Sequence, residues 1–179
     1  MKIRWPIATI VIFTITAAAT ALQFRFPSLV TLLGRTPAAL EAHQYWRLIT
    51  PIFIDPEGWL QIVVNLTGLL VLGVLVEHIA GPGRWLIFYF SGALAGELAG
   101  LAWKPFGAGS SVAVCGLLGG LAALLIRRPI WPPRIGGLVI VAGAVTLICF
   151  RDLHGPPLLA GALLGFILLN QPETYPRTK

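Results

Sequence analysis

The stretch from residue 58 to residue 103 reads GWLQIVVNLTGLLVLGVLVEHIAGPGRWLIFYFSGALAGELAGLAW. Two apolar runs, at 59–80 and 85–103, are separated by a short turn sequence that contains glycine, proline and arginine. A helix needs about 20 residues to cross the hydrocarbon core of a membrane. The stretch therefore predicts two membrane helices joined by a tight turn, and it sets the class of the whole chain.

The rest of the sequence has the same apolar character. Of the 179 residues, 56% are hydrophobic and 11% are charged, whereas a soluble domain usually carries about 25% charged residues. We expect an all-α membrane protein with a single six-helix domain over residues 1–170 and a short C-terminal tail over 171–179. The predicted membrane helices are six apolar stretches, at about 5–23, 59–80, 85–103, 108–126, 135–150 and 153–169.

Positive charges predict the orientation of these helices. With both termini in the cytoplasm, the inner segments hold eight lysines and arginines and the outer segments hold five. Cytoplasmic loops carry an excess of these residues, so we expect an integral protein of a bacterial plasma (inner) membrane. Lys2 and Arg4 precede the first apolar run, so a secretory signal is the alternative for that run. The semi-apolar segment 24–57 is expected to lie in the outer membrane interface as part of the first outer loop.

The net charge of +6 is explained by this orientation. A nucleic-acid-binding protein shows a basic face with interleaved aromatic residues, and the sequence has none. The predicted surroundings are therefore the lipid bilayer, with no nucleic acid as partner. No metal-binding or phosphate-binding motif is evident, so we expect no cofactor.

Two chemically useful side chains stand at the outer ends of predicted helices. Ser111, next to Ser110, opens the helix at 108–126, and His154 opens the helix at 153–169. Both helices start from the same side of the membrane, so the hydroxyl and the imidazole are expected at similar depth. A serine hydroxyl becomes a nucleophile when an imidazole takes its proton. The two residues are therefore a candidate catalytic dyad with an outward-facing site.

Polar residues in other helices extend this candidate site. Gln61 and Asn65 are four residues apart, so they share one helical face, and their amides are candidate donors to an oxyanion. Amides and hydroxyls in membrane helices also commonly link helices without any chemical role, and this alternative stays open. Glu97 is expected to be protonated or hydrogen-bonded to a neighbouring helix, and His43 is expected to be solvated.

Four segments carry a resemblance to a known family: YWRLITPIF (45–53), GWLQIVVNLTGLLVLGVLVEHIAGPGRWLIFYFSGALAG (58–96), GSSVAVCGLLGG (109–120) and HGPPLLAGALLG (154–165). They resemble the rhomboid intramembrane serine proteases. The resemblance implies a six-helix rhomboid-like bundle. It also implies a serine endopeptidase that cleaves single-pass or other transmembrane protein substrates in or near their membrane segments.

The resemblance assigns roles residue by residue. Alignment of the GLLG sequence puts the nucleophile of the family's G-x-S-G motif on Ser111, with Ser110 as the alternative. The general base falls on His154. The family's oxyanion asparagine falls on Asn65, and Gln61 stands where the family has a histidine.

Some positions depart from the family's pattern: Val112, Gln61, Cys115 and Pro157. Val112 replaces a glycine beside the nucleophile, Cys115 replaces an aromatic residue that supports the histidine, and Pro157 replaces a glycine after it. These departures leave open a catalytically weak or inactive rhomboid-like pseudoprotease that binds membrane helices. A transporter or channel would need a continuous polar path, which the inner halves of the predicted helices lack.

Overall fold

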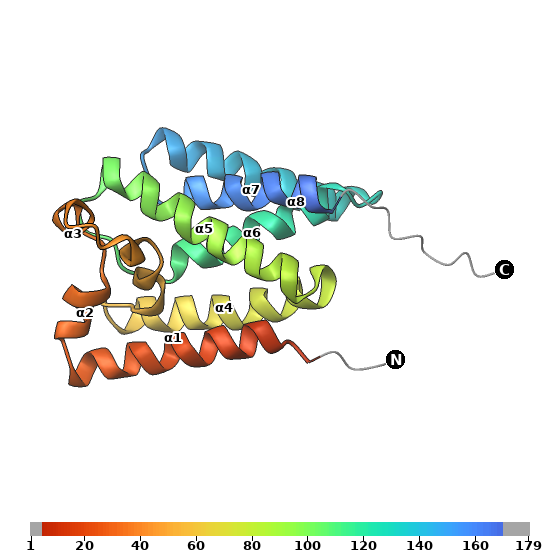
Figure 1. Ribbon diagram of the computed structural model, residues 1–179. Helices are drawn as coiled ribbons and strands as arrows, with labels where there is room; N and C mark the ends of the chain where they lie inside the picture. The colour runs from red at the N-terminus through yellow and green to blue at the C-terminus, as the bar shows by residue number, and fades with distance from the viewer. Residues whose placement is uncertain (1–4, 170–179) are drawn as a thin grey trace.

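The computed structural model describes residues 5–169, and the predicted tail at 171–179 lies outside this range. Within it, every regular element is a helix (Figure 1), so the all-α prediction is confirmed for the described residues. The long helices are α1 (Ile7–Arg25), α4 (Trp59–Ala80), α5 (Pro82–Trp103), α6 (Ser111–Ile126), α7 (Trp131–Cys149) and α8 (Gly155–Leu168). The short ones, between α1 and α4, are α2 (Ser28–Leu33), α3 (Pro37–Glu41) and the 3-10 helices η1 (Tyr45–Leu48) and η2 (Thr50–Phe53).

Four of the long helices are long and apolar enough to cross a membrane. They are α1, α4, α5 and α7, with 19 to 22 residues each. The other two, α6 and α8, are also apolar but have only 16 and 14 residues. Large apolar side chains are exposed on the outer surface of the bundle, among them Leu60, Val139 and Leu163. A surface of this kind is stable in hydrocarbon rather than in water, so the chain is an integral membrane protein.

Of the six long helices only α4 begins at the residue expected from the sequence. The shifted starts of α7 and α6 have clear local causes. The helix α7 begins at Trp131 rather than at 135, because Pro132 and Pro133 fit into its first turn, where backbone N–H groups have no intrahelical acceptor. The helix α6 begins at Ser111 rather than at 108, because Gly109 has a φ of +133°. This conformation is accessible to glycine and is incompatible with a right-handed helix.

The central element of the bundle is α6, which contacts α4, α5, α7 and α8. Its glycines allow this close packing. A Cβ atom built on Gly161 of α8 would lie well under 3.0 Å from the carbonyl oxygen of Gly116, and one built on Gly116 would meet the carbonyl oxygen of Phe88 in α5. Stripes of small residues let helix backbones approach closely in membrane proteins. Glycine therefore sets the distance between α6 and α8.

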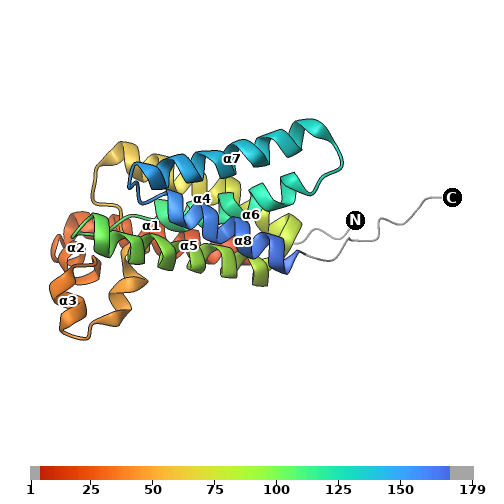
Figure 2. The same ribbon diagram turned by 90° about the horizontal axis from the view of Figure 1, so that it is seen from above.

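The helices alternate in direction, so functional ends gather at one side. The starts of α4, α6 and α8 lie at the end of the bundle where α1, α5 and α7 finish (Figures 1 and 2). The short helices α2 and α3 lie at this same end. The opposite end holds the start of α1 and the finish of α8. The expectation that the predicted helices at 108–126 and 153–169 start from one side therefore agrees with the arrangement of α6 and α8.

Glu77 of α4 fixes the first turn of α1. Its carboxylate accepts the backbone N–H of Ala8 at 2.9 Å, and the backbone N–H and hydroxyl of Thr9 at 2.7 Å each. We expect Glu77→Ala to lower the free energy of unfolding by about 2–4 kcal/mol, because three buried donors lose their acceptor. Thermal unfolding in detergent micelles measures this, with the exposed Glu41→Ala as control. Equal melting temperatures for the two variants would contradict the assignment.

Candidate active site

Ser111 and His154 meet at the starts of two neighbouring helices. Ser111 is the first residue of α6, and His154 immediately precedes α8, whose first residue is Gly155. The hydroxyl oxygen of Ser111 lies 3.0 Å from Nε2 of His154. The sequence placed His154 inside the first turn of its helix. It is instead the N-cap residue, because the helix begins one residue later.

Ser110 has a different environment from its neighbour. It is fully buried, its hydroxyl lies 3.2 Å from Oδ2 of Asp55, and its backbone N–H donates to Oδ1 of Asp55 at 3.0 Å. Its hydroxyl is therefore committed to a structural carboxylate, whereas the hydroxyl of Ser111 faces an imidazole. Of the two serines, Ser111 is the one whose hydroxyl lies within hydrogen-bond distance of an imidazole.

Asp55 connects three helices beneath the candidate site, and the sequence analysis did not identify it. The side-chain amide of Asn65 in α4 donates to its Oδ1 at 2.7 Å. The side-chain amide of Gln23 in α1 makes two hydrogen bonds with the backbone of Asp55. Its Nε2 donates to the carbonyl at 2.7 Å, and its Oε1 accepts the N–H at 3.2 Å. Burial raises the pKa of Asp55, while the hydrogen bonds from Ser110 and Asn65 act in the opposite direction. The residue therefore holds the N-cap of α6 against α1 and α4.

The two predicted oxyanion residues take up different positions. Asn65 is buried, and its Nδ2 donates to Asp55, so one of its two amide hydrogens is already committed. Gln61 lines a cavity beside Ser111, and its Oε1 is buried with no hydrogen-bond partner among residues 5–169. A Cβ atom on Gly109 would lie 3.2 Å from Nε2 of Gln61 and 3.8 Å from the hydroxyl oxygen of Ser111. The glycine therefore leaves space between the amide and the hydroxyl.

The cavity beside the serine has a volume of about 80 Å³. Ser111 and His154 both line it, together with Gln61 and with charged side chains such as Glu57 and Lys104. This volume accommodates several water molecules. Water, which any hydrolysis consumes, therefore has room next to the hydroxyl and the imidazole.

Two of the departures from the rhomboid pattern, Val112 and Pro157, pack against Gly96 of α5. A Cβ atom on Gly96 of α5 would lie 2.6 Å from Cβ of Val112 and 3.2 Å from Cγ of Pro157. Gly96 thus provides the space into which the valine and the proline fit. Val112 is accordingly only 5% exposed, although it also contributes to the cavity wall. Its extra volume is accommodated between α5 and α6.

Asp152 is the second residue of the site that the sequence analysis did not identify. Its Oδ1 lies 2.6 Å from Nδ1 of His154 and accepts the backbone N–H of the same histidine at 2.9 Å. Partial burial raises the pKa of Asp152. The hydrogen bonds from His154 and the positive charge of Lys104 outweigh this effect, so the pKa lies below its ordinary value. The only signal in the sequence was that Asp152 lies two residues before His154. At this spacing an aspartate side chain can accept the backbone N–H of the later residue.

The environments of Glu97 and His43 are also defined. Glu97 forms an ion pair of 2.6 Å with Arg35, and both side chains are buried. Its partner thus lies on the segment between α2 and α3 and not on a neighbouring helix, where the hydrogen bond was expected. The backbone of Arg35 also exchanges two hydrogen bonds with Gly107, just before α6.

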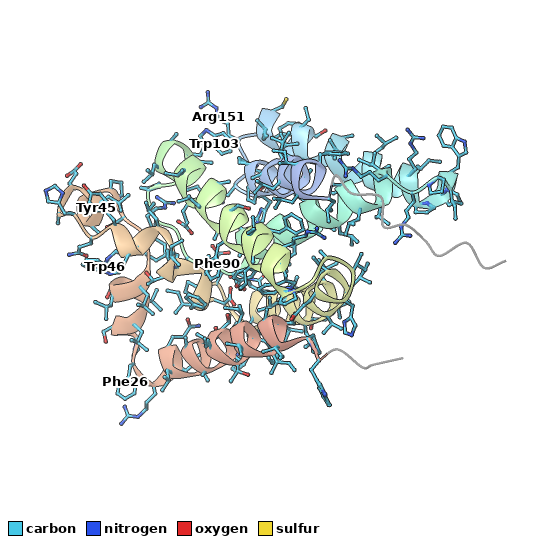
Figure 3. All side chains as sticks on the ribbon, turned by 45° about the vertical axis from the view of Figure 1, so that its right-hand side comes forward. Phe26, Tyr45, Trp46, Phe90, Trp103 and Arg151 are labelled. Carbon is cyan, nitrogen blue, oxygen red and sulfur yellow. The ribbon has the colours of Figure 1, made fainter. Side chains whose placement is uncertain are left out.

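His43 is exposed and lies 2.9 Å from the hydroxyl of Tyr45, which Figure 3 shows on the outer side of the short helices.

Comparisons with known proteins identify the family. The rhomboid domain model matches residues 42–171. Rhomboid protease GluP of Bacillus subtilis is 30% identical over 122 residues, which cover 67% of this chain and 24% of that protein. Rhomboid-like protease 3 of Toxoplasma gondii is 35% identical over 95 residues, covering 51% of this chain and 36% of that protein. RHOMBOID-like protein 6, mitochondrial, of Arabidopsis thaliana is 28% identical over 146 residues, covering 75% and 47%.

The chain therefore belongs to the rhomboid family. It spans between about a quarter and a half of the length of these three relatives. The match includes all of α4 to α8 and thus every side chain that lines the cavity.

Proposed function

We propose that this protein is an intramembrane serine protease. It hydrolyses a peptide bond in or near the transmembrane segment of a membrane-protein substrate. The observation that carries the proposal is the 3.0 Å approach of the Ser111 hydroxyl to Nε2 of His154 at the wall of a cavity. Membership of the rhomboid family supports it.

The proposed reaction uses the two side chains in sequence. The hydroxyl oxygen of Ser111 attacks the scissile carbonyl carbon, and its proton passes to Nε2 of His154. The imidazolium then gives this proton to the leaving amine as the C–N bond breaks, which leaves an acyl group on Ser111. Water in the cavity then attacks the acyl carbon while His154 accepts its proton. The imidazolium returns this proton to the oxygen of Ser111 as the acyl C–O bond breaks, which releases the second product and restores the free hydroxyl. No metal or cofactor takes part in these steps.

Three sources of hydrogen bonds are proposed for the oxyanion. The backbone N–H groups of Ser111 and Val112 open α6, ahead of the first hydrogen bonds of the helix, which Ala113 and Val114 donate to the carbonyl of Ser110. N–H groups at a helix start carry the positive end of the helix dipole. The amide of Gln61 lies at the cavity. Asn65 is buried and does not line the cavity, but its Nδ2 carries one hydrogen beyond the one it donates to Asp55. Donors fixed before the reaction stabilise the developing charge without reorganisation.

The proposed membrane arrangement has six crossings within a single domain over residues 1–170. A helix of 16 residues is about 24 Å long, shorter than the hydrocarbon core of about 30 Å. We therefore expect Ser111 a few ångströms below the outer membrane surface, with the cavity as its route to water. Both termini face the cytoplasm of a bacterial cell in this proposal, and the segment 24–57 lies in the outer interface.

Cleavage in proteoliposomes tests the proposal. Purified protein is reconstituted with a panel of single-pass membrane substrates carrying tags at both ends, and the products are identified by mass spectrometry. We expect cleavage by the wild-type protein, and a rate at least about 10³-fold lower in His154→Ala. Co-purification of substrates without cleavage by the wild-type protein would contradict the proposal and indicate a pseudoprotease.

Gln61→Ala tests the proposed oxyanion site. Loss of one donor to an oxyanion lowers kcat by about 10²–10³-fold in serine proteases. Several donors share the role here, so we expect a decrease of about 10–100-fold in kcat with little change in KM. Oε1 of Gln61 has no hydrogen-bond partner in the described structure, so the melting temperature should stay within about 2 °C of wild type. An unchanged kcat would exclude Gln61 from the oxyanion site.

A further inference from the structure

We propose that Asp152 is a positioning residue that extends the dyad into a Ser–His–Asp triad. This role rests on the proposed protease function. Its carboxylate lies on the far side of the imidazole from the nucleophile. Oδ1 of Asp152 is 2.6 Å from Nδ1 of His154, while Nε2 of the same ring is 3.0 Å from the hydroxyl oxygen of Ser111. The three side chains thus form one continuous line of hydrogen bonds.

The carboxylate determines which ring nitrogen carries the proton. An ionised carboxylate only accepts hydrogen bonds, so Nδ1 of His154 must be the donor in the 2.6 Å contact with Asp152. In the neutral ring Nε2 then has a free lone pair, and this lone pair faces the hydroxyl of Ser111. The same carboxylate stabilises the imidazolium that forms when the serine loses its proton. Asp152 therefore prepares His154 to act as a base.

The turn between α7 and α8 holds the carboxylate in place. The backbone N–H of Asp152 donates to the carbonyl of Leu147 at 2.9 Å, and its carbonyl accepts from Gly155 at 3.3 Å. Its Oδ1 also accepts the backbone N–H of His154 at 2.9 Å. Arg151, directly before it, has a φ of +55°, which is uncommon for a residue other than glycine. The turn thus fixes backbone and side chain of Asp152 together.

Exposure to solvent weakens the interaction between Asp152 and His154. The side chains of His154 and Asp152 are 41% and 39% exposed, and exposed ion pairs are weaker than buried ones. The other ionisable groups around the imidazole are Lys104, Glu57 and Cys115, together with Glu97, which is paired with Arg35. We therefore expect Asp152 to contribute about 10–100-fold to kcat, less than the roughly 10⁴-fold effect of a fully buried aspartate in a serine protease.

The test compares Asp152→Asn with Asp152→Glu and with Glu41→Gln, an exposed carboxylate at the end of α3. Asparagine is a good acceptor for backbone N–H groups, so Asp152→Asn retains the structural hydrogen bond while it removes the charge. We expect kcat to fall about 10–100-fold in Asp152→Asn with KM and melting temperature unchanged. Asp152→Glu should recover part of the loss, and Glu41→Gln should behave as wild type.

The split between kcat and KM, together with the recovery in Asp152→Glu, separates positioning from structure. Removal of the charge with the backbone hydrogen bond retained should lower kcat without a change in KM or in melting temperature. A wild-type kcat in Asp152→Asn would overturn the inference, as would a loss of kcat that is matched by lower stability and is not recovered in part by Asp152→Glu. Both results leave the protease proposal standing if the wild-type protein cleaves its substrate. An inactive wild-type protein would instead overturn the proposed function itself.

Discussion

Substitution of Ser111 by alanine is expected to abolish proteolysis, with cleavage of a reconstituted substrate falling by about 10⁴-fold or more. The reason is that the acyl intermediate has no other atom on which to form. His154 would keep its contact with Asp152 at 2.6 Å, so the protein should remain folded. Initial rates in proteoliposomes at saturating substrate measure the effect, and thermal unfolding checks the fold.

Ser110→Ala is the matched control for this experiment. The two serines are adjacent, but the hydroxyl of Ser110 bonds Asp55 at 3.2 Å and is fully buried. We expect Ser110→Ala to lose about 1 kcal/mol of stability, the worth of a typical hydrogen bond, and to retain proteolysis. Loss of activity in Ser110→Ala together with a working Ser111→Ala protein would contradict the assignment of the nucleophile.

Gly161→Ala is expected to destabilise the packing of α8 against α6. A Cβ atom at this position of α8 would lie well under 3.0 Å from the carbonyl oxygen of Gly116 in α6. Backbone atoms cannot move aside as a flexible side chain can, so the two helices must separate. Overpacking of this kind costs about 1–3 kcal/mol. Because Ser111 and His154 stand at the starts of these helices, proteolysis should fall as well.

Gly143→Ala is the control for the packing experiment. Gly143 lies within α7, and a Cβ atom there would meet nothing within 4 Å. Alanine is about 1 kcal/mol more favourable than glycine inside a helix, so the control should be as stable as wild type or slightly more stable. Thermal unfolding in micelles measures both variants. Equal stability of Gly161→Ala and Gly143→Ala would contradict the close packing of α6 against α8.

The sequence was informative where a pattern is local. Apolar runs indicated the long helices. Because successive helices cross in opposite directions, the helices at 108–126 and 153–169 were predicted to start on the same side. The ends of the helices were predicted less accurately, because they depend on the backbone conformation of single residues. The φ of +133° at Gly109 delays the start of α6, and the prolines after Trp131 open α7 where they had been expected to precede it.

The sequence was least informative about hydrogen bonds between distant segments. Asp55 bonds Ser110, 55 residues further along the chain, and Glu97 bonds Arg35 at a separation of 62 residues. No periodicity connects such pairs, because they depend on how the short helices fold back on the bundle. Asp152 is only two residues from His154, but its role depends on the turn that brings both to Ser111. The candidate site residues could be identified in the sequence, whereas their hydrogen-bond partners could be identified only in the folded structure.

Mapping the adduct of a serine-reactive fluorophosphonate tests the central claim most directly. The probe forms a stable bond only with an activated hydroxyl, so it reports the pairing of Ser111 with His154 without any knowledge of the substrate. Peptide mass spectrometry of the labelled wild-type protein should locate the adduct on Ser111, with labelling strongly reduced in His154→Ala. An adduct on Ser110, or no adduct on either serine, would contradict the account.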